Sequence, residues 1–543
     1  MKKEVSRERV SGFLHACGRN ICNDRGETVL LVGWGLGNWL LCEGYMWNLA
    51  DCAQFDRPRR IERTVEDLTG KAYAKRFWKR YRETFIQESD LQMMAEMGYN
   101  SLRVPIAARL FIEEGPKIRF REEGFHLLDT LLNLCEKYGL YVFLDLHAAP
   151  GGQTGANIDD SVDDLCRLFI DQAQFERGLA LWEEIARRYQ DRWIVGGYDL
   201  LNEPIRPVRY PGDVDLDMYI PRLREFYEQA IERIRLHDTR HMIALEGVHW
   251  ATDTSIFDHV YDPNMVIHFH RYGCAPDISA FKPYLEAAQR LNLPLWLGET
   301  GENTMAWFSA MMPLAFRLGI SVTMWPWKKM TCINSPCSVH EPDDWSMIRA
   351  YLEGGAQPDY STAQRIFDQL LHHIRMENCD LNEQINAQVF RTPGCEIHGT
   401  DFDEMPGPEE SCHHAPAAYA PGCYRVDTGM EIIGQFDDGD KQFLFDGPWR
   451  SALLRLHQEE WAQYSVYDVT SSSNLEIQCF SDEPSRLEVR QNGTLLSVFD
   501  LSGMRYEQVL SGMHLYNADA CQIRLTVLRG VVKIGNISIR PIS

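Results

Sequence analysis

Two glutamates, each near the end of a short apolar run, are the residues whose type and placement best suit chemistry. Glu203 ends the run within Tyr198–Pro204, where the proline has no N–H for a further ladder hydrogen bond. Glu299 ends a second run of the same design, Pro294–Thr300. Two carboxyl groups that face each other across a pocket suit cleavage of a glycosidic bond, because one protonates the leaving oxygen while the other attacks the sugar or activates water.

The two glutamates would divide the work of a retaining glycosidase. Glu203 would be the acid/base, and its neutral form needs a raised pKa. Glu299 would be the nucleophile, with Arg103 and Tyr272 hydrogen-bonded to it and orienting it. Asn202, directly before Glu203, would hold the 2-hydroxyl of the sugar.

These residues belong to a larger set of polar and aromatic side chains at the ends of predicted strands. Active sites of closed strand-helix barrels lie at the carboxyl ends of the strands, so one shared end indicates one site. Trp325 would supply an apolar floor for a sugar ring. The full set is Arg103, His147, Asn202, Glu203, Glu246, His249, Trp250, His268, His270, Tyr272, Glu299, Trp325 and Trp327.

Two other interpretations stay open from the residues alone. A metal-dependent barrel hydrolase would bind its ion through His268 and His270, because residues two apart on a strand share a face. Such a site also needs an early His-x-His, and the first predicted strand has none. A non-catalytic sugar-binding barrel would keep the pocket without turnover.

Eight apolar runs alternate with amphipathic segments, which is typical of strand-helix units around a parallel sheet. Eight such units predict an α/β fold, a closed (β/α)₈ barrel. A doubly wound sheet is disfavoured, because Gly33–Gly37 lacks the spacing of a phosphate-binding glycine fingerprint. The predicted strands are 29–35, 99–104, 141–146, 198–202, 241–245, 265–269, 295–298 and 320–324. The predicted helices are 73–97, 122–138, 162–189, 216–236, 283–291, 305–318 and 362–376.

The character of the chain changes after about residue 380. We predict a barrel over 1–380, a linker-like segment rich in Pro, Gly, Cys and His over 381–423, and an all-β sandwich over 424–543, a candidate carbohydrate-binding module. Turn pairs such as Asn492-Gly493 separate the alternating runs that predict the sandwich. Those runs are 464–469, 475–480, 486–491, 494–499, 521–528 and 531–539.

The composition of the chain limits the classes of partner that it can bind. The net charge of −23 over 543 residues disfavours nucleic acid, because binders of polyanions need a basic face. No uncharged run reaches the roughly 18 residues of a membrane span, and residues 1–10 lack the apolar region of a secretory signal, so we expect a cytoplasmic protein. The 15 scattered cysteines have neither disulfide nor zinc-ribbon spacing, and we predict no metal.

Taken together, the strand-end motifs resemble glycoside hydrolase family five of clan A, the cellulase-like (β/α)₈ retaining β-glycosidases. The resemblance covers Val29–Lys328. The opening segment Gly33–Leu40, with Glu43, is similar to the exo-β-1,3-glucanase branch. The other similar motifs, in the order of the family, are Arg103–Ile106, Asp145–Gly151, Leu201–Pro204, His270–Tyr272, Gly298-Glu299 and Trp325–Lys328.

This resemblance implies the same acid/base, Glu203, and the same nucleophile, Glu299. It implies that Glu43 binds hydroxyls of the terminal sugar, which favours exo action, and it leaves His268 as a packed or hydrogen-bonded barrel residue. It also implies that six residues line the subsite where the bond is cut: Arg103, His147, Asn202, His270, Tyr272 and Trp325.

The sequence therefore predicts a retaining β-glycosidase that cleaves β-linked glucosides or gluco-oligosaccharides, with no metal and no organic cofactor. β-Mannosidase or transglycosidase activity on the same scaffold stays open, since hydrolysis and transfer share the glycosyl-enzyme intermediate. The loop Gly152–Asp160 and the insert Leu49–Leu68 depart from the glucanase pattern and could reshape the pocket.

Overall fold

A computed structural model describes most of the chain. The described residues are 5–49, 52–209, 213–403, 412–413, 424–434, 448–470, 472–503 and 506–541. They form two compact units. The first comprises Met1–His270, Pro283–Thr300 and Gly319–Leu381, and the second comprises Arg271–Lys282, Gly301–Leu318 and Asn382–Ser543.

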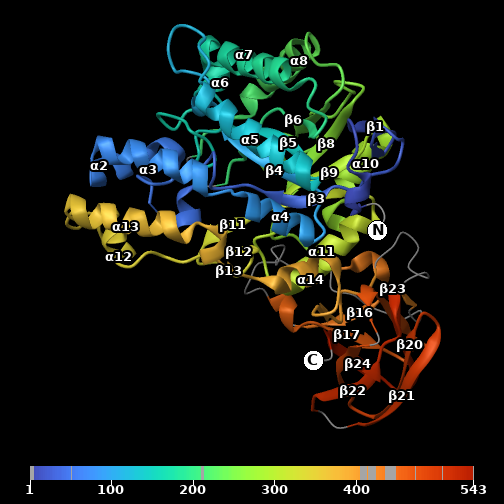
Figure 1. The fold of residues 1–543 in the computed structure, drawn as a ribbon. Coiled ribbons are helices and arrows are strands. Elements are labelled where there is room, and N and C mark those ends of the chain that lie inside the picture. The colour runs from blue at the N-terminus through green and yellow to red at the C-terminus, as the bar shows by residue number, and fades with distance from the viewer. Residues whose placement is uncertain are drawn as a thin grey trace. The chain divides into compact units, whose positions relative to one another are not determined.

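The first unit is built on a closed barrel of eight strands in the order β10-β3-β4-β5-β6-β7-β8-β9, paired in parallel (Figure 1). The predicted (β/α)₈ fold is therefore confirmed, and each of the eight predicted runs contributes a strand. The strands are β3 Val32–Gly35, β4 Ser101–Ala107, β5 Tyr141–Ala148, β6 Val195–Asp199, β7 Met242–Glu246, β8 Met265–Arg271, β9 Leu295–Thr300 and β10 Ser321–Met324.

Strand β6 begins and ends three residues earlier than predicted. Its first half holds Gly196 and Gly197, which have low strand propensity and conceal the strand in the sequence. In the barrel these glycines give room to the ring of Phe143, because a Cβ on Gly196 would lie 2.6 Å from Cε2 of that ring. Packing inside the barrel thus overrides local propensity at this strand.

The helices of the first unit follow the strands, as predicted, but the predicted segments 73–97 and 162–189 are each divided into two helices. Residues 73–97 form two helices, because Asp90 accepts a hydrogen bond of 2.9 Å from the backbone N–H of Gln87 and starts a new helix. The helices are α2 Pro58–Thr69, α3 Lys71–Thr84, α4 Glu88–Glu96, α5 Glu122–Tyr138, α6 Arg167–Ile170, α7 Gln172–Tyr189, α8 Ile220–Arg235, α9 Val248–Ala251, α10 Lys282–Leu291, α12 Trp345–Leu352 and α13 Tyr360–His373.

Two smaller elements complete the first unit. A hairpin of β1 His15–Cys17 and β2 Asn20–Cys22 precedes the barrel, and its Ile21 belongs to a buried cluster with Phe143 and Trp296. Those two rings lie 4.4 Å apart between centroids. The amino end of the barrel is thus filled with apolar side chains. A three-stranded sheet is formed by β11 Lys328–Met330, β12 Cys337–Val339 and β13 Asp380–Leu381.

The second unit contains two antiparallel sheets, in agreement with the predicted all-β domain. One has the order β16-β17-β24-β19-β22, with β14 beside β24, and the other has the order β15-β18-β23-β20-β21. Strand β19 alternates buried and half-buried residues, as expected of a sheet with one face in a core. The strands are β14 Glu396–His398, β15 Cys412–His413, β16 Glu431–Ile433, β17 Leu453–Leu456, β18 Trp461–Val469, β19 Ser473–Phe480, β20 Pro484–Gln491, β21 Thr494–Ser502, β22 Gln508–His514, β23 Ala518–Arg529 and β24 Val532–Pro541.

Helix α11, Met305–Arg317, belongs to the second unit although its sequence lies between barrel strands β9 and β10. It packs against α14, Glu383–Phe390, where the rings of Phe316 and Phe390 stack at 6.1 Å between centroids. The segment predicted as linker-like therefore contains regular structure at its start, while its residues 404–411 and 414–423 lie outside the described part of the chain. None of the helices that the structure describes is long and apolar enough to cross a membrane.

Candidate active site

The carboxyl ends of the barrel strands bring most of the predicted site residues together. Arg103 lies on β4, His147 on β5, His270 on β8 and Glu299 on β9. Asn202 and Glu203 follow β6, and Trp325 follows β10. One face of one barrel thus holds residues from across about 220 positions of sequence, as expected for an active site of this fold.

Glu299 is held by cationic and imidazole groups. Its Oε1 accepts a hydrogen bond from Nη1 of Arg103. Nδ1 of His147 lies 3.9 Å from Oε1, and Nδ1 of His270 lies 3.7 Å from Oε2. The side chain is 7% exposed, so its carboxylate is fixed in place yet open to the mouth of the barrel.

Glu203 lies in a left-handed backbone turn with φ of 40°. Such a conformation is uncommon for a residue with a side chain and is often found at functional sites. Its N–H donates to Oε2 of Glu246 at 2.6 Å, and its Oε1 lies 2.8 Å from Nδ1 of His270. Carboxylate oxygens of Glu203 and Glu299 lie within 4.8 Å of each other, so the two groups can act on one bond.

Arg103 is fully buried and binds carboxylates from four other strands. Besides Glu299, its guanidinium contacts Asp145 at 3.1 Å, Asp199 at 2.8 Å and Glu246 at 2.9 Å. Burial alone would lower the pKa of Arg103, but these charges outweigh burial and raise it. The arginine therefore stays charged and opposes the negative charge that gathers at this end of the barrel.

The three buried carboxyl groups that Arg103 contacts differ in pKa because their neighbours differ. Burial raises the pKa of Asp145 and raises that of Glu246 to about 8. Burial would raise the pKa of Asp199 too, but His268 and Arg103 beside it hold that pKa below its usual range. Only part of this acidic cluster is thus ionised at neutral pH.

His147 and Asn202 are fixed by contacts on both sides. Burial lowers the pKa of His147 to about 3, so the ring is neutral and bears one proton. Nδ1 donates this proton to Asp145 at 2.7 Å, and Nε2 accepts from the side-chain amide of Asn202 at 3.2 Å. The amide oxygen of Asn202 accepts from Arg103 at 2.8 Å, which orients the whole side chain.

Trp325 forms a flat wall beside these groups. Its ring stacks on His147 with 5.4 Å between centroids and 4° between planes. Gly35 leaves room for it, since a Cβ there would lie 2.3 Å from the indole. The indole N–H donates to the hydroxyl of Tyr45 at 2.8 Å. Buried Glu43 stands at the start of the same short turn as Tyr45.

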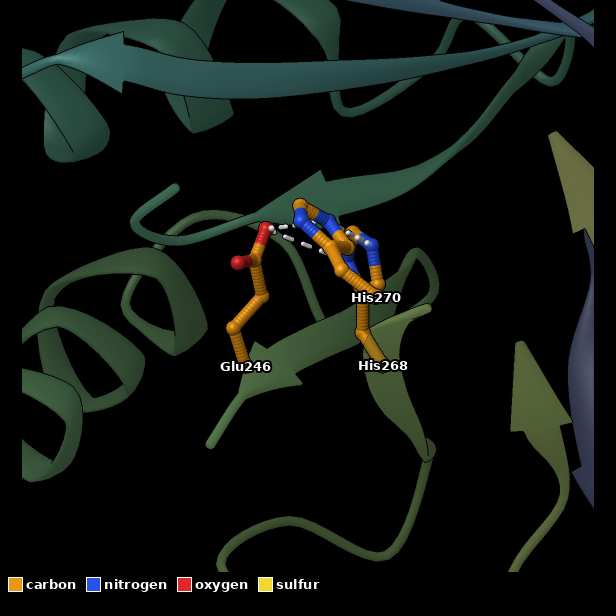
Figure 2. Close-up of side chains that lie close together, drawn as sticks. All are labelled: Glu246, His268 and His270. Atoms are coloured by element: carbon orange, nitrogen blue, oxygen red, sulfur yellow. Dashed lines mark hydrogen bonds and ion pairs between the residues drawn. The ribbon is translucent and has the colours of Figure 1, made fainter. Parts of the chain in front are cut away.

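Figure 2 shows Glu246, His268 and His270, whose side chains point toward one another from β7 and β8. These residue types can bind a metal, and their ligand atoms lie within 4.8 Å of one another. Each of their four imidazole nitrogens, however, lies close to a polar atom of a neighbouring side chain. Nδ1 of His268 lies 3.1 Å from Asp199, the two Nε2 atoms lie 3.0 Å apart, and Nδ1 of His270 faces Glu203. We interpret the group as a chain of proton-sharing contacts.

Sequence reasoning missed the roles of Asp145 and Asp199, and it placed Glu246 at a strand end without a partner. One signal was present, because Asp145 and His147 are two apart on a strand and share a face. Tyr272 directly follows β8, and its side chain is 37% exposed. Its predicted contact with Glu299 stays a prediction.

Gly298 gives a first test of this packing. A Cβ on Gly298 would lie 1.7 Å from Nε2 of His268, the atom that contacts His270. We expect Gly298→Ala to lower the free energy of unfolding by about 1–3 kcal/mol through overpacking, and to lower any turnover. Thermal unfolding would measure the first effect. In Gly115→Ala the new Cβ meets no described heavy atom within 4 Å, and an equal loss there would contradict the explanation.

Comparison with known proteins agrees with this geometry. Residues 64–331 match the model of the family Cellulase (glycosyl hydrolase family 5). A "Beta-xylosidase" of Phanerodontia chrysosporium is 30% identical over 285 residues, which are 52% of this chain and 56% of that protein. A "Glucan 1,3-beta-glucosidase" of Lachancea kluyveri is 26% identical over 284 residues, 48% of this chain and 60% of that protein. The chain thus spans little more than half the length of these two relatives.

Among solved structures, endoglucanase Cel5A of Thermotoga maritima aligns with a TM-score of 0.39 and 19% identity. The alignment covers 55% of this chain and 89% of that one.

Proposed function

Because the barrel of this chain belongs to glycosyl hydrolase family 5, we propose that it is a retaining, exo-acting β-glycosidase of β-linked glucosides or gluco-oligosaccharides. The observation that best supports this proposal is the pair Glu203 and Glu299, whose carboxylate oxygens lie within 4.8 Å of each other. Carboxyl groups about 5–5.5 Å apart are typical of retaining enzymes, whereas inverting enzymes leave room for a water between them.

In the first step Glu299 attacks the anomeric carbon. Nη1 of Arg103 donates a hydrogen bond to Oε1 of Glu299 and holds the carboxylate in place for this attack. The electron pair of the breaking C–O bond stays on the leaving oxygen, which takes a proton from Glu203. The product of the step is a glycosyl ester on Glu299.

In the second step Glu203 acts as a base. Its carboxylate takes a proton from water, the water oxygen attacks the same anomeric carbon, and Glu299 departs as a carboxylate. Two inversions restore the original configuration. His270, 2.8 Å from Glu203, is the group that shares the proton in transit.

Three features support action on the terminal sugar. Trp325 offers an apolar face for one ring, and sugar faces stack on aromatic rings of this kind. Glu43 and Tyr45 come from the segment that contacts this tryptophan, and we assign the hydroxyls of the terminal sugar to Glu43. The Lachancea relative is named a glucosidase, which agrees with a glucoside substrate.

The test is a panel of aryl β-glycosides, including the β-glucoside, β-mannoside and β-xyloside, together with short β-glucans. We expect release of single glucose units from a β-glucoside, with the β-anomer formed first by NMR. A first-formed α-anomer would contradict the retaining step. Products longer than the substrate would instead indicate sugar transfer.

Replacing the acid/base should affect substrates unequally. Glu203→Gln removes the transferable proton, so we expect about 10²–10⁴-fold slower cleavage of oligosaccharides, whose leaving group must be protonated. Formation of the glycosyl-enzyme from a 2,4-dinitrophenyl glycoside should change little, because that leaving group departs as an anion. Pre-steady-state release of dinitrophenolate measures this step. If the cleavage rates of both substrates fell equally, Glu203 would not be the acid.

A further inference from the structure

Glu246, at the carboxyl end of β7, contacts both halves of the candidate site. Its Oε2 accepts the N–H of Glu203 at 2.6 Å, and its Oε1 accepts from Nη2 of Arg103 at 2.9 Å. Arg103 in turn binds Glu299. The fully buried Glu246 thus links the backbone of the acid/base to the side chain that holds the nucleophile.

The same carboxylate lies beside both imidazole rings (Figure 2). Its Oε1 lies 3.5 Å from Nδ1 of His268 and 3.5 Å from Nε2 of His270. The charged and titratable groups that face Glu246 are Arg103 of β4, Asp145 of β5, Asp199 of β6, His268 and His270 of β8, and Tyr227 of α8, whose hydroxyl donates to the main-chain oxygen of Glu246 at 2.9 Å.

The proton inventory of this group follows from its contacts. Burial lowers the pKa of His268 to about 3, so that ring is neutral, and Asp199 beside Nδ1 favours the single proton there. Nε2 of His268 then accepts from Nε2–H of His270. One further proton remains for the contact between Nδ1 of His270 and Glu203, and it resides either on the ring or on the carboxyl.

Three carboxyl groups, those of Glu203, Glu246 and Glu299, lie around the ring of His270. Burial would lower the pKa of His270, but the charges of Glu246 and Glu299 and the contact with Glu203 outweigh burial and raise it. Glu246 is the member of this set that neither attacks the sugar nor donates to the leaving group. Because burial raises the pKa of Glu246 to about 8, its carboxyl is charged mainly on the alkaline side of that pH, and this charge can be removed without removing a reacting atom.

We propose that Glu246 is a positioning residue for Glu203: it fixes the backbone turn that presents the acid/base carboxyl, and its charge retains the proton that Glu203 and His270 share. This inference rests on the proposed glycosidase function. Its two parts are separable, because a hydrogen-bond acceptor fixes the backbone and a negative charge retains the proton.

Two substitutions of Glu246 separate its role as a hydrogen-bond acceptor from its role as a negative charge. Glu246→Gln keeps an acceptor for the N–H of Glu203 but removes the charge, so we expect the alkaline limb of kcat/KM to move to lower pH by about one to three units, with the acidic limb in place. The sign follows because the loss of a nearby anion lowers the pKa of His270. Glu246→Ala also removes the acceptor, and we expect a further loss of about tenfold in kcat on oligosaccharides.

Asp238→Asn is the matched control. Asp238 is a buried carboxylate paired with His241. His241 directly precedes β7, so this pair lies at the end of the strand opposite to Glu246. Its loss should leave the alkaline limb unchanged. The proposal would be overturned if the alkaline limb of kcat/KM in Glu246→Gln stayed at its wild-type pH. It would also be overturned if this limb moved equally far in Asp238→Asn.

A second readout does not depend on turnover. Imidazole NMR of histidine-labelled protein, with the signal of His270 assigned from a His270→Asn variant, gives the pKa of His270 directly. A lower pKa in Glu246→Gln than in the wild type is the expected result, and an equal pKa overturns the proposal. If the wild type cleaves nothing in the glycoside panel, the proposed function fails, and this titration still decides whether Glu246 retains the proton.

Discussion

Glu299→Ala should abolish turnover of every glycoside that the wild type cleaves, with at least about a 10⁴-fold loss in kcat. The substitution removes the only protein group that bonds to the anomeric carbon in the proposed mechanism. Folding should be largely retained, because Arg103 keeps three other carboxyl partners, Asp145, Asp199 and Glu246, when Glu299 is removed. Sugar binding, measured by calorimetry, should survive.

Azide added to the variants distinguishes the nucleophile from the acid/base. In Glu299→Ala, azide can enter the vacated volume and attack an activated β-glycoside once, which gives an α-glycosyl azide. In Glu203→Ala, azide would attack the glycosyl-enzyme as the second nucleophile and give the β-azide. Glu286→Ala, an exposed glutamate on α10, is the matched control and should keep full activity. Wild-type activity in Glu299→Ala would refute the assigned nucleophile.

Arg103→Met should give the largest loss of stability. Three fully buried carboxyl groups, those of Asp145, Asp199 and Glu246, would lose their shared cation. Breaking buried ion pairs by removal of one partner costs about 3–5 kcal/mol, because the remaining charge stays buried and unpaired. Urea unfolding followed by tryptophan fluorescence measures the effect. Arg192→Met, which removes a partly exposed arginine, should stay within about 0.5 kcal/mol of the wild type.

The loss of unfolding free energy in Arg103→Met should depend on pH, and Asp199 sets the direction of this dependence. In the wild type its pKa lies below the unfolded value of about 3.9, so its contribution to stability is present above that value and is lost as pH falls through the folded pKa. Without Arg103 this folded pKa rises. The difference in unfolding free energy between variant and wild type should therefore shrink below about pH 4. A difference that is constant from pH 7 to pH 3 would contradict the role of the charge.

Much of the barrel was predictable because its signals are local. Each strand is a short apolar run, and α5 begins and ends at its predicted residues, Glu122 and Tyr138. Strand β6 was displaced because Gly196 and Gly197 carry no strand signal of their own, and a ring from another strand fills the space above them. The strands β16, β17 and β22 were likewise not predicted.

The candidate site was predictable in its residues and not in its contacts. Glu203 and Glu299 stand out because each follows an apolar run. That Arg103 meets Asp199 and Glu246 follows only from closure of the barrel, which brings residues about 100 or more positions apart to within 3 Å. The left-handed turn at Glu203 also has no signature in a lone Asn-Glu-Pro.

The grouping of α11 bears on how this protein could have arisen. A helix encoded between two barrel strands packs its Phe316 on Phe390 of α14, in the unit that contains the β sheets. Loss of the part after Leu381 would expose that apolar surface of α11 to water. We therefore expect that replacement of the β sheets by another domain exposes this surface, and that a change of volume at Phe316 is matched by one at Phe390. We expect co-inheritance of the barrel and the β domain among sequences that keep this pair.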